Sequence, residues 1–370
     1  MKIAHITLDG FYNQGGILQR YALCEVLKRY SDTVDSLWYD NGLLLENNWK
    51  TLYPWIDKKN RNLKLLVKLF LNWKNLRNIF LKGSNYKAIH RDTLIKSFAD
   101  RHINIKYNVD YERISDEYDY FVVGSDQVWN PNYVNLSHYM LNFAKEKQRI
   151  SYAASISLNS IPSKNIDDFQ KGITGMKAIS VREEKATDII RKMTGRSVEV
   201  VCDPTILIEK EKWIEIERKP YWLDENEEFI ITYYLGKRKD YYISDVGKKM
   251  NWRVINIFGT LDEDEVVASP EEWLYLIHHA NLVYTDSFHG AVFSILFKTP
   301  FIVTSRIGGH DMSSRIDSLL SMFGLQGRWG NIDNNYLKNS LTDISFDMVD
   351  KVIATESRKA TDYLNRALSL

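Results

Sequence analysis

The chain of 370 residues carries 49 basic and 48 acidic side chains, and its formal charge of +1 gives no reason to expect nucleic acid as a partner. A hydrophobic content of 44% is that of a globular protein, and the length favours two domains over one. The two cysteines, Cys24 and Cys202, match no zinc-ligand spacing or disulfide framework, which excludes the small metal-stabilised and disulfide-rich classes.

The first predicted element is a strand at residues 2–8, KIAHITL. A lysine inside it argues against a secretory signal peptide, and no apolar run elsewhere reaches the length that spans a bilayer. We therefore expect the protein to work in the cytoplasm.

A glycine pair follows that strand, in Asn13, Gln14, Gly15 and Gly16. We expect these residues to form a loop whose glycines let the backbone approach a ligand, or else a plain turn. The segment does not match GxGxxG, and no acidic residue follows at the distance that a dinucleotide site needs. The next residues, ILQRYALCEVLKRY, have the apolar period of a helix.

Residues 58–82 differ from the rest of the chain in charge, with eight lysines or arginines and no acidic residue. On a helical wheel the larger apolar side chains share one face, and the opposite face is polar and basic: Leu66, Leu69, Phe70, Trp73 and Phe80 against Lys64, Lys68, Asn75 and Lys82. This pattern is typical of a helix on an anionic membrane surface, although a helix packed on the core with a solvated basic face has it too. We place the helix in a basic helical insertion of about residues 45–105.

Five more strands are predicted in the first half of the chain, at residues 33–40, 119–126, 149–156, 178–183 and 198–204. Helix-like sequence lies between the later ones, for example at residues 183–195, where Gly195 supplies a helix stop. Such alternation is typical of a parallel sheet in a doubly wound α/β fold.

Polar side chains stand where three of these strands end: Asp126 with Gln127, then Arg182, then Asp203. Because the carboxyl ends of parallel strands form the ligand-binding edge, Asp126 is our first candidate for a general base and Asp203 the second. Arg182 is the candidate ligand for a phosphate or carboxylate. Helix capping by Asp126, a surface ion pair of Arg182 and a plain Asp-Pro turn at Asp203 are the alternatives.

The second half repeats the pattern after a charged stretch without a period at residues 212–229. Strands are predicted at residues 229–235, 253–258, 281–286 and 300–305, and helices at 238–250, 269–280 and 291–298. The sequence therefore predicts an α/β fold of two Rossmann-like doubly wound domains facing a cleft. Their bounds are residues 1–215 and 225–340, and a C-terminal helix follows at 341–370.

The strand at residues 281–286 passes directly into a helix through Ser287, His289 and Gly290. The start of that helix exposes backbone N–H groups, and a histidine beside them suits an anionic ligand; a capping serine and a packed histidine are the alternative. Arg306 and Arg315 follow the next strand, and an arginine in the first turn of a helix opposes the helix dipole, which also indicates an anion. The acidic run LDEDEVV precedes a helix and predicts no metal site.

Taken in chain order, NQGGILQRYAL, FVVGSDQVWNP, ISYAAS, ISVREEKA, CDPTIL and TDSFHGAVFSILFKTPFIV resemble the motifs of the polysaccharide pyruvyl transferase family, over roughly residues 1–325. The resemblance implies a fold similar to that of the GT-B glycosyltransferases and transfer of pyruvate from phosphoenolpyruvate to a sugar as a cyclic ketal. It also implies that Arg182 and His289 serve the donor site. The family often has an arginine two residues before that histidine, where this chain has Ser287, so Arg306 or Arg315 is expected to replace it.

The residue types suit that chemistry. The phosphate and carboxylate of phosphoenolpyruvate are expected to bind the three arginines and the helix start at Ser287 and Gly290, with His289 and an aspartate as acid and base. Residues 13–16 and Gln127 are assigned to the acceptor side. We expect no metal or other cofactor, and a polyprenyl-linked sugar of a bacterial surface polysaccharide precursor as acceptor. The basic helix would reach that acceptor at the inner face of the cell membrane.

Two other functions fit the same sequence. A sugar-nucleotide glycosyltransferase with the GT-B fold would need a nucleobase and diphosphate pocket in the second domain. A non-catalytic scaffold of a polysaccharide assembly complex would not depend on Arg182 or His289. The pyruvyltransferase and the glycosyltransferase are distinguished by which donor, phosphoenolpyruvate or a sugar nucleotide, raises the melting temperature of the protein. The sequence leaves open the acceptor sugar, the ketal positions and stereochemistry, and the oligomeric state.

Overall fold

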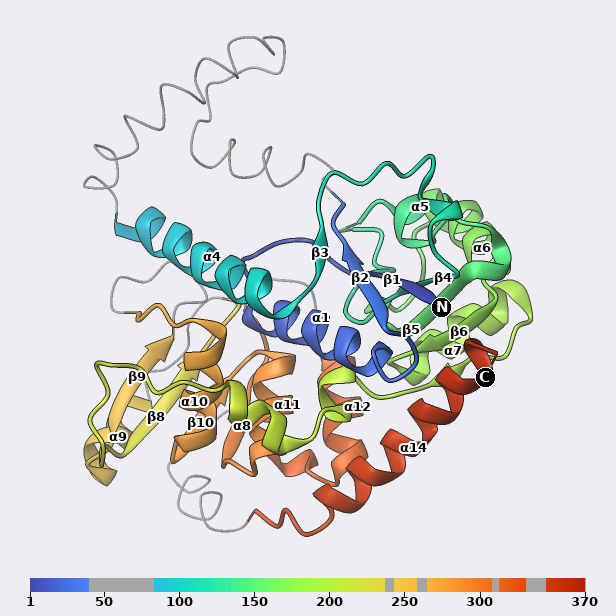
Figure 1. Ribbon diagram of the computed structural model, residues 1–370. Helices are drawn as coiled ribbons and strands as arrows, with labels where there is room; N and C mark the ends of the chain where they lie inside the picture. Colours follow the sequence, from blue (N-terminus) through green and yellow to red (C-terminus); the bar gives the residue numbers. More distant parts are fainter. Residues whose placement is uncertain are drawn as a thin grey trace.

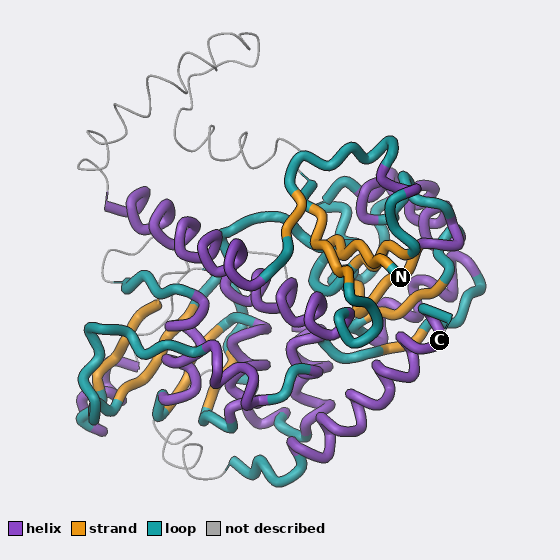
Figure 2. The backbone as a smooth tube through the Cα atoms, in the orientation of Figure 1, coloured by secondary structure: helices purple, strands orange, loops and turns teal. Residues whose placement is uncertain are grey.

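The computed structural model describes residues 1–39, 83–132, 134–236, 243–257, 265–307, 313–330 and 344–369. Within these ranges, two parallel β-sheets are covered by helices (Figures 1 and 2). The basic segment at residues 58–82 lies outside the described residues, so the prediction made for it is not addressed by the structure.

The first sheet has seven strands, and every neighbouring pair is parallel. In spatial order they are β3 (Ile105–Lys106), β2 (Thr33–Leu37), β1 (Lys2–Ile6), β4 (Tyr120–Val123), β5 (Arg149–Ala154), β6 (Ala178–Val181) and β7 (Glu199–Val200). The central strands are buried along most of their length, as expected of a parallel sheet covered on both faces.

Helices connect the strands of this sheet. The longer ones are α1 (Gln14–Leu27), α4 (Gly83–His102), α6 (Ile166–Thr174) and α7 (Glu184–Thr194), with a short α5 (Leu136–Tyr139). The described ranges of this half also contain the 3₁₀ turns η1 (Ile114–Asp116), η2 (Glu146–Gln148), η3 (Ser163–Asn165) and η4 (Pro204–Leu207). Helix α7 ends at Gly195, whose φ of 71° is the left-handed conformation that glycine adopts at a helix end without steric cost.

The second sheet has four parallel strands, in the order β11 (Phe301–Val303), β10 (Leu282–Thr285), β8 (Phe229–Tyr233) and β9 (Arg253–Ile257). Helix α8 (Lys210–Ile216) precedes it in the chain. The helices that follow are α9 (Ile243–Met250), α10 (Pro270–His279), α11 (Phe288–Phe297) and α12 (Ser313–Phe323), and then comes the 3₁₀ turn η5 (Gln326–Arg328). All five residues of β8 are buried, so this sheet is also covered on both faces.

The last helix, α14 (Val349–Ala367), runs from the second half of the molecule back to the first (Figure 1). The Tyr363 hydroxyl donates to the carbonyl of Ser151 in β5 at 2.6 Å, and Lys177 donates to the carbonyl of Ala367 at 2.6 Å. The chain end therefore holds the two halves together.

Helix α1 lies between the two sheets and contacts α10 and α11 of the second half (Figure 1). Apolar side chains from both halves form one continuous core, and Gln14 donates from its side-chain amide to the carbonyl of Ala268 at 2.7 Å. This packing brings the carboxyl ends of the first sheet up to the start of α11.

The prediction of a loop at residues 13–16 is wrong. Asn13 is the N-cap of α1, and its side chain accepts from the backbone N–H of Gly16 at 3.3 Å. Gln14, Gly15 and Gly16 therefore form the first helical turn. The cap provides a hydrogen-bond acceptor that offsets the weak helix propensity of two glycines.

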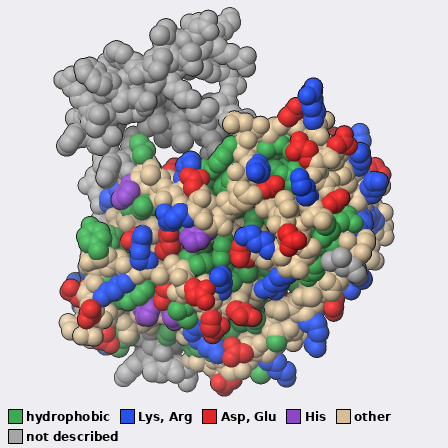
Figure 3. All heavy atoms as spheres, viewed as in Figure 1, with side chains coloured by type: hydrophobic (Ala, Val, Ile, Leu, Met, Phe, Trp, Pro, Cys, Tyr) green, Lys and Arg blue, Asp and Glu red, His purple; other side chains and the backbone are tan. Residues whose placement is uncertain are grey.

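The surface carries charges of both signs. Figure 3 shows acidic and basic side chains interspersed over the visible face of the described residues, in keeping with a net charge near zero. Among the helices of the described ranges, none is both long and apolar enough to cross a membrane.

Candidate active site

Five charged or titratable side chains from both halves of the molecule meet beside the carboxyl ends of the first sheet. Asp126 follows β4, Arg182 follows β6 and Asp203 follows β7. His289 lies in the first turn of α11 and Arg315 in the first turn of α12. Each of these residues is less than a tenth exposed, so they form a buried ion cluster between the two sheets.

Asp203 is the centre of this ion cluster. Its Oδ2 accepts from Arg182 Nη1 at 2.7 Å and from the Ser125 hydroxyl at 3.0 Å, and its Oδ1 accepts from the backbone N–H and hydroxyl of Thr205 at 3.1 and 2.7 Å. His289 Nε2 lies 3.6 Å from the same Oδ2. Burial alone would raise the pKa of the Asp203 carboxyl, but His289, Arg182 and Thr205 hold that pKa well below its usual range.

Arg182 reaches further into the cluster. Its Nη2 lies 3.7 Å from Asp126 Oδ1, and its guanidinium sits over the Phe288 ring at 4.4 Å. Its Nε and Nη2 have no hydrogen-bond partner among the described residues. Burial alone would lower the pKa of this guanidinium, but Asp203, Glu183 and Asp126 raise it. A permanently charged group therefore keeps two N–H donor atoms that an anion can occupy.

Arg315 brings a second guanidinium to the same place. Its Nη1 lies 3.4 Å from Asp126 Oδ1, and its guanidinium stands 5.7 Å from the Phe288 ring centre. Burial, followed by the charge of Arg182, lowers the pKa of Arg315 to about 10. Two buried arginines beside the same carboxylate favour a further anion, because the charge of Arg182 destabilises that of Arg315.

His289 faces the start of α1. A Cβ atom on Gly15 would lie 2.3 Å from its Nδ1, so only glycine leaves room for the ring in its present position. His289 Nε2 makes no hydrogen bond within the described ranges, and the ring is nearly buried. A buried imidazole whose ring nitrogen has no hydrogen-bond partner in the fold is suited to exchange a proton with a bound molecule.

The other residues expected at the site have mostly structural contacts. Ser287 caps α11, because its hydroxyl accepts from the Gly290 N–H at 3.2 Å. A Cβ on Gly290 would lie 2.9 Å from the Thr285 hydroxyl, so Gly290 is required for packing. Arg306 donates to the carbonyl of Asp286 at 3.4 Å and is only half-buried.

On the first-domain side, Asn13 and Gln14 are occupied by capping and interdomain hydrogen bonds. Gln127 donates its backbone N–H to the Asp126 carboxylate at 2.9 Å.

Three residues that contact the ion cluster were not predicted as site residues: Ser125, Thr205 and Phe288. Ser125 directly precedes Asp126, and Thr205 lies two residues after Asp203. Their hydroxyls beside strand-end carboxylates were the sequence signal that could have identified them. The role of Phe288 had no signal in the sequence, because the two arginines that pack on it are 106 and 27 residues away, by subtraction of their numbers.

A buried histidine supports the strand end that carries Ser125 and Asp126. His5 in β1 contacts the Gly124 carbonyl through Nε2 at 2.7 Å, and its Nδ1 lies 3.4 Å from both Cys24 Sγ and the Ser36 hydroxyl. Burial lowers the pKa of His5 to about 3. The ring is therefore neutral at physiological pH and donates to Gly124, which positions the following turn.

Comparison with solved structures identifies the fold. UDP-GlcNAc 2-epimerase from Neisseria meningitidis, bound to UDP-GlcNAc, superimposes with a TM-score of 0.52 at 12% identity, covering 99% of this chain and 100% of that one. The S. aureus MnaA–UDP structure gives a TM-score of 0.53 at 10% identity, with 100% and 98% coverage. A putative UDP-N-acetylglucosamine 2-epimerase from Listeria monocytogenes gives 0.51 at 10% identity, with 100% and 97% coverage. At such identities the likeness shows a GT-B-like fold, as predicted, and no more.

Comparison with curated proteins finds no match. The family model described as polysaccharide pyruvyl transferase matches residues 13–306, a range that contains Asp126, Arg182, Asp203 and His289. This range is well over half of the chain. The protein is therefore an enzyme that belongs to the polysaccharide pyruvyl transferase family, as its motifs indicated.

Proposed function

We propose that this enzyme transfers pyruvate from phosphoenolpyruvate to a sugar of a surface polysaccharide precursor, forming a cyclic ketal. The observation that carries the proposal is the meeting of Arg182, Arg315 and His289, from both domains, in one buried ion cluster. Phosphoenolpyruvate has a phosphate and a carboxylate, and guanidiniums bind both groups in a bidentate manner.

In this proposal the donor lies against the two arginines. Arg182 offers Nε and Nη2, two donor atoms that make no hydrogen bond among the described residues. Arg315 replaces the family arginine whose position Ser287 occupies, because it is nearly buried beside Phe288 and Arg182 while Arg306 is turned toward Asp286. The packed Phe288 ring keeps both guanidiniums at their present spacing.

His289 serves as the acid and base. The methylene carbon of phosphoenolpyruvate takes a proton from the imidazolium, and the acceptor hydroxyl bonds to the central carbon while its own proton passes to the imidazole. A second hydroxyl then attacks the same carbon, the bond to the phosphate oxygen breaks, and inorganic phosphate leaves with the second proton. These steps are acid–base chemistry and require no resident metal or redox cofactor.

The two aspartates have a positioning role in this scheme. Asp203 accepts from Arg182, Ser125 and Thr205, and a carboxylate with so low a pKa is a weak base. Asp126 lies between the two guanidiniums, at 3.4 and 3.7 Å. We therefore propose that both carboxylates hold the arginines in place, and that the base first expected at Asp126 is His289.

The donor test is a thermal-shift measurement with phosphoenolpyruvate and with a panel of sugar nucleotides, followed by intact-mass analysis of an acceptor after incubation. We expect phosphoenolpyruvate to raise Tm and to add one pyruvate ketal to the acceptor, because a ligand that binds only the folded state stabilises it. Stabilisation by a sugar nucleotide instead would support the glycosyltransferase alternative, with which the GT-B-like fold is also consistent. No response to either, together with unaltered cell phenotype of the His289→Ala variant, would support the scaffold alternative.

Gly15→Ala should lower turnover about 10²-fold, because the added Cβ would displace the His289 ring by roughly 1 Å from its reacting position. Gly16→Ala is the matched control: its Cβ would meet Asn13 at an ordinary 3.5 Å, and both changes add the same methyl to the same helical turn. Steady-state kinetics of the two variants measure the difference. Equal losses would show that Gly15 has no special relation to His289.

The acceptor is proposed to be polyprenyl-linked and reached through the basic segment at residues 58–82. Each lysine or arginine near an anionic bilayer contributes about 1 kcal/mol at best, so even part of the eight would give salt-sensitive association. Flotation with anionic and neutral liposomes at low and high salt measures it, with Lys64, Lys68 and Lys74 changed to Glu as the test variant. Equal flotation with anionic and neutral liposomes would contradict this part of the proposal.

A further inference from the structure

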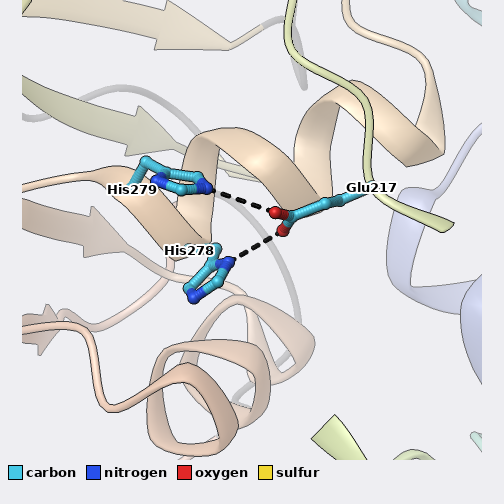
Figure 4. A group of neighbouring side chains, drawn as sticks. All are labelled: Glu217, His278 and His279. Atoms are coloured by element: carbon cyan, nitrogen blue, oxygen red, sulfur yellow. Dashed lines mark hydrogen bonds and ion pairs between the residues drawn. The ribbon is translucent and has the colours of Figure 1, made fainter. Parts of the chain in front are cut away.

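Three side chains of metal-ligating type, none of them part of the ion cluster, converge where α8 and α10 meet (Figure 4). Glu217 directly follows α8, and His278 and His279 are the last two residues of α10. His278 Nδ1 lies 2.9 Å from Glu217 Oε2, and His279 Nε2 lies 3.2 Å from Glu217 Oε1. We propose that these three side chains form a binding site for a divalent transition-metal ion of the Zn²⁺ class.

The choice of ring nitrogens is what makes the site possible. Consecutive helical residues point about 100° apart, so two neighbouring histidines do not normally reach one point. Here His278 uses its near nitrogen, Nδ1, and His279 its far nitrogen, Nε2, and both meet the same carboxylate (Figure 4). The three ligand atoms lie within 4.8 Å of one another. Tetrahedral Zn²⁺ with bonds of about 2.0–2.1 Å needs separations near 3.3 Å, which small side-chain rotations supply.

The rings of His278 and His279 each pack against an aromatic side chain. His278 stacks on Phe297 with ring centres 4.5 Å apart, and His279 stacks on Tyr275 at 4.1 Å. Fixed rings lose little freedom when they bind an ion, which favours affinity. The side chain of His279 is 42% exposed, so an ion and a completing water ligand can enter from solvent.

The charge of the site also suits a cation. Its acidic member, Glu217, supplies carboxylate oxygens, and the two imidazoles supply one nitrogen each. Such a set of one carboxylate and two imidazoles is among those that bind Zn²⁺.

The position suggests a structural ion. Glu217 belongs to the connection between the two domains, whereas both histidines belong to the second domain. An ion bound here would fasten that connection to the end of α10. Glu217 and His278 are 61 residues apart in sequence, which is why no ligand spacing marked them.

The test uses tag-free full-length protein stripped with a chelator and titrated with Zn²⁺ by calorimetry and with Co²⁺ by visible absorption. We expect one ion per chain, the visible bands of tetrahedral Co²⁺, and a rise in Tm of several degrees with Zn²⁺. Glu217→Gln and His278→Gln should each weaken binding at least tenfold. His90→Gln, at an exposed histidine outside the trio, controls for surface binding and should leave affinity unchanged.

Absence of a stoichiometric ion would overturn the proposal, and so would wild-type affinity in both Glu217→Gln and His278→Gln. If either of these two variants unfolds, the Co²⁺ spectrum of His279→Gln tests the proposal in its place. Loss of one nitrogen ligand must change the band positions if His279 binds the ion. The proposal is independent of pyruvyl transfer, since none of the three residues belongs to the ion cluster.

Discussion

His289→Ala should lower turnover by 10²-fold or more while leaving phosphoenolpyruvate affinity within a few-fold of the wild-type value. Within the described residues, Nε2 of His289 makes no hydrogen bond. Loss of an acid–base group typically lowers the rate by about 10²–10⁴-fold. The donor would still bind, because Arg182 and Arg315 keep their contacts with Asp203 and Asp126. Single-turnover kinetics with a thermal-shift titration of the donor measure both quantities.

His90→Ala serves as the matched control for this substitution, because His90 is an exposed histidine on α4. Its turnover should equal that of the wild type. A folded His289→Ala variant that keeps more than half of wild-type turnover would exclude His289 as the acid–base group. A parallel loss of donor affinity would assign the residue to donor binding instead.

Arg182→Lys should lower kcat/KM by about 10²–10³-fold, with much of the loss in donor affinity. Lysine keeps a positive charge beside Asp203 but removes the planar fork, including the Nε and Nη2 atoms that make no hydrogen bond in the described part of the chain. The lysine variant is the informative one. Arg182→Ala would leave the buried carboxylate of Asp203 without its cation and cost about 3–5 kcal/mol of stability, which would confuse folding with function.

Arg191→Lys is the control for this change, since Arg191 is exposed on α7 and pairs only with Asp188 in the described contacts. It should alter neither kinetics nor Tm. If Arg182→Lys retained wild-type donor affinity and turnover, Arg182 would not bind the donor, and the placement of phosphoenolpyruvate against the two guanidiniums would be wrong.

Much of the architecture could be predicted from local patterns in the sequence. The strands at β1, β4, β5, β8 and β10 have apolar runs of the right length between polar residues, and α7 and α10 have a helical period with identifiable ends at Gly195 and Ser269. Such signals depend on neighbours within a few residues, which the sequence contains in full. Motif order added the family and pointed to the strand ends that carry Asp126, Arg182 and Asp203.

Local patterns were misleading where one side chain stabilises a helix that its neighbours disfavour. Two glycines at residues 15 and 16 predicted a loop, but the Asn13 cap starts α1 there, and the first glycine is required by contact with His289 from the other domain. Ser287 was assigned to the donor with helix capping as the alternative, and its hydroxyl does cap α11; the donor assignment stays a prediction.

What the sequence by itself determined was the two-domain α/β class, the family and the strand-end residues, because each is encoded by neighbouring residues or by motif order. Only the tertiary structure decided which arginine stands beside Arg182, since Arg306 and Arg315 lie nine residues apart and either could have taken the place left by Ser287. It also decided that Asp203 and Asp126 are engaged by guanidiniums, and that Glu217 meets His278 and His279. These contacts join residues far apart in the chain, and their energies depend on burial and distance, which exist only after the two domains have packed together.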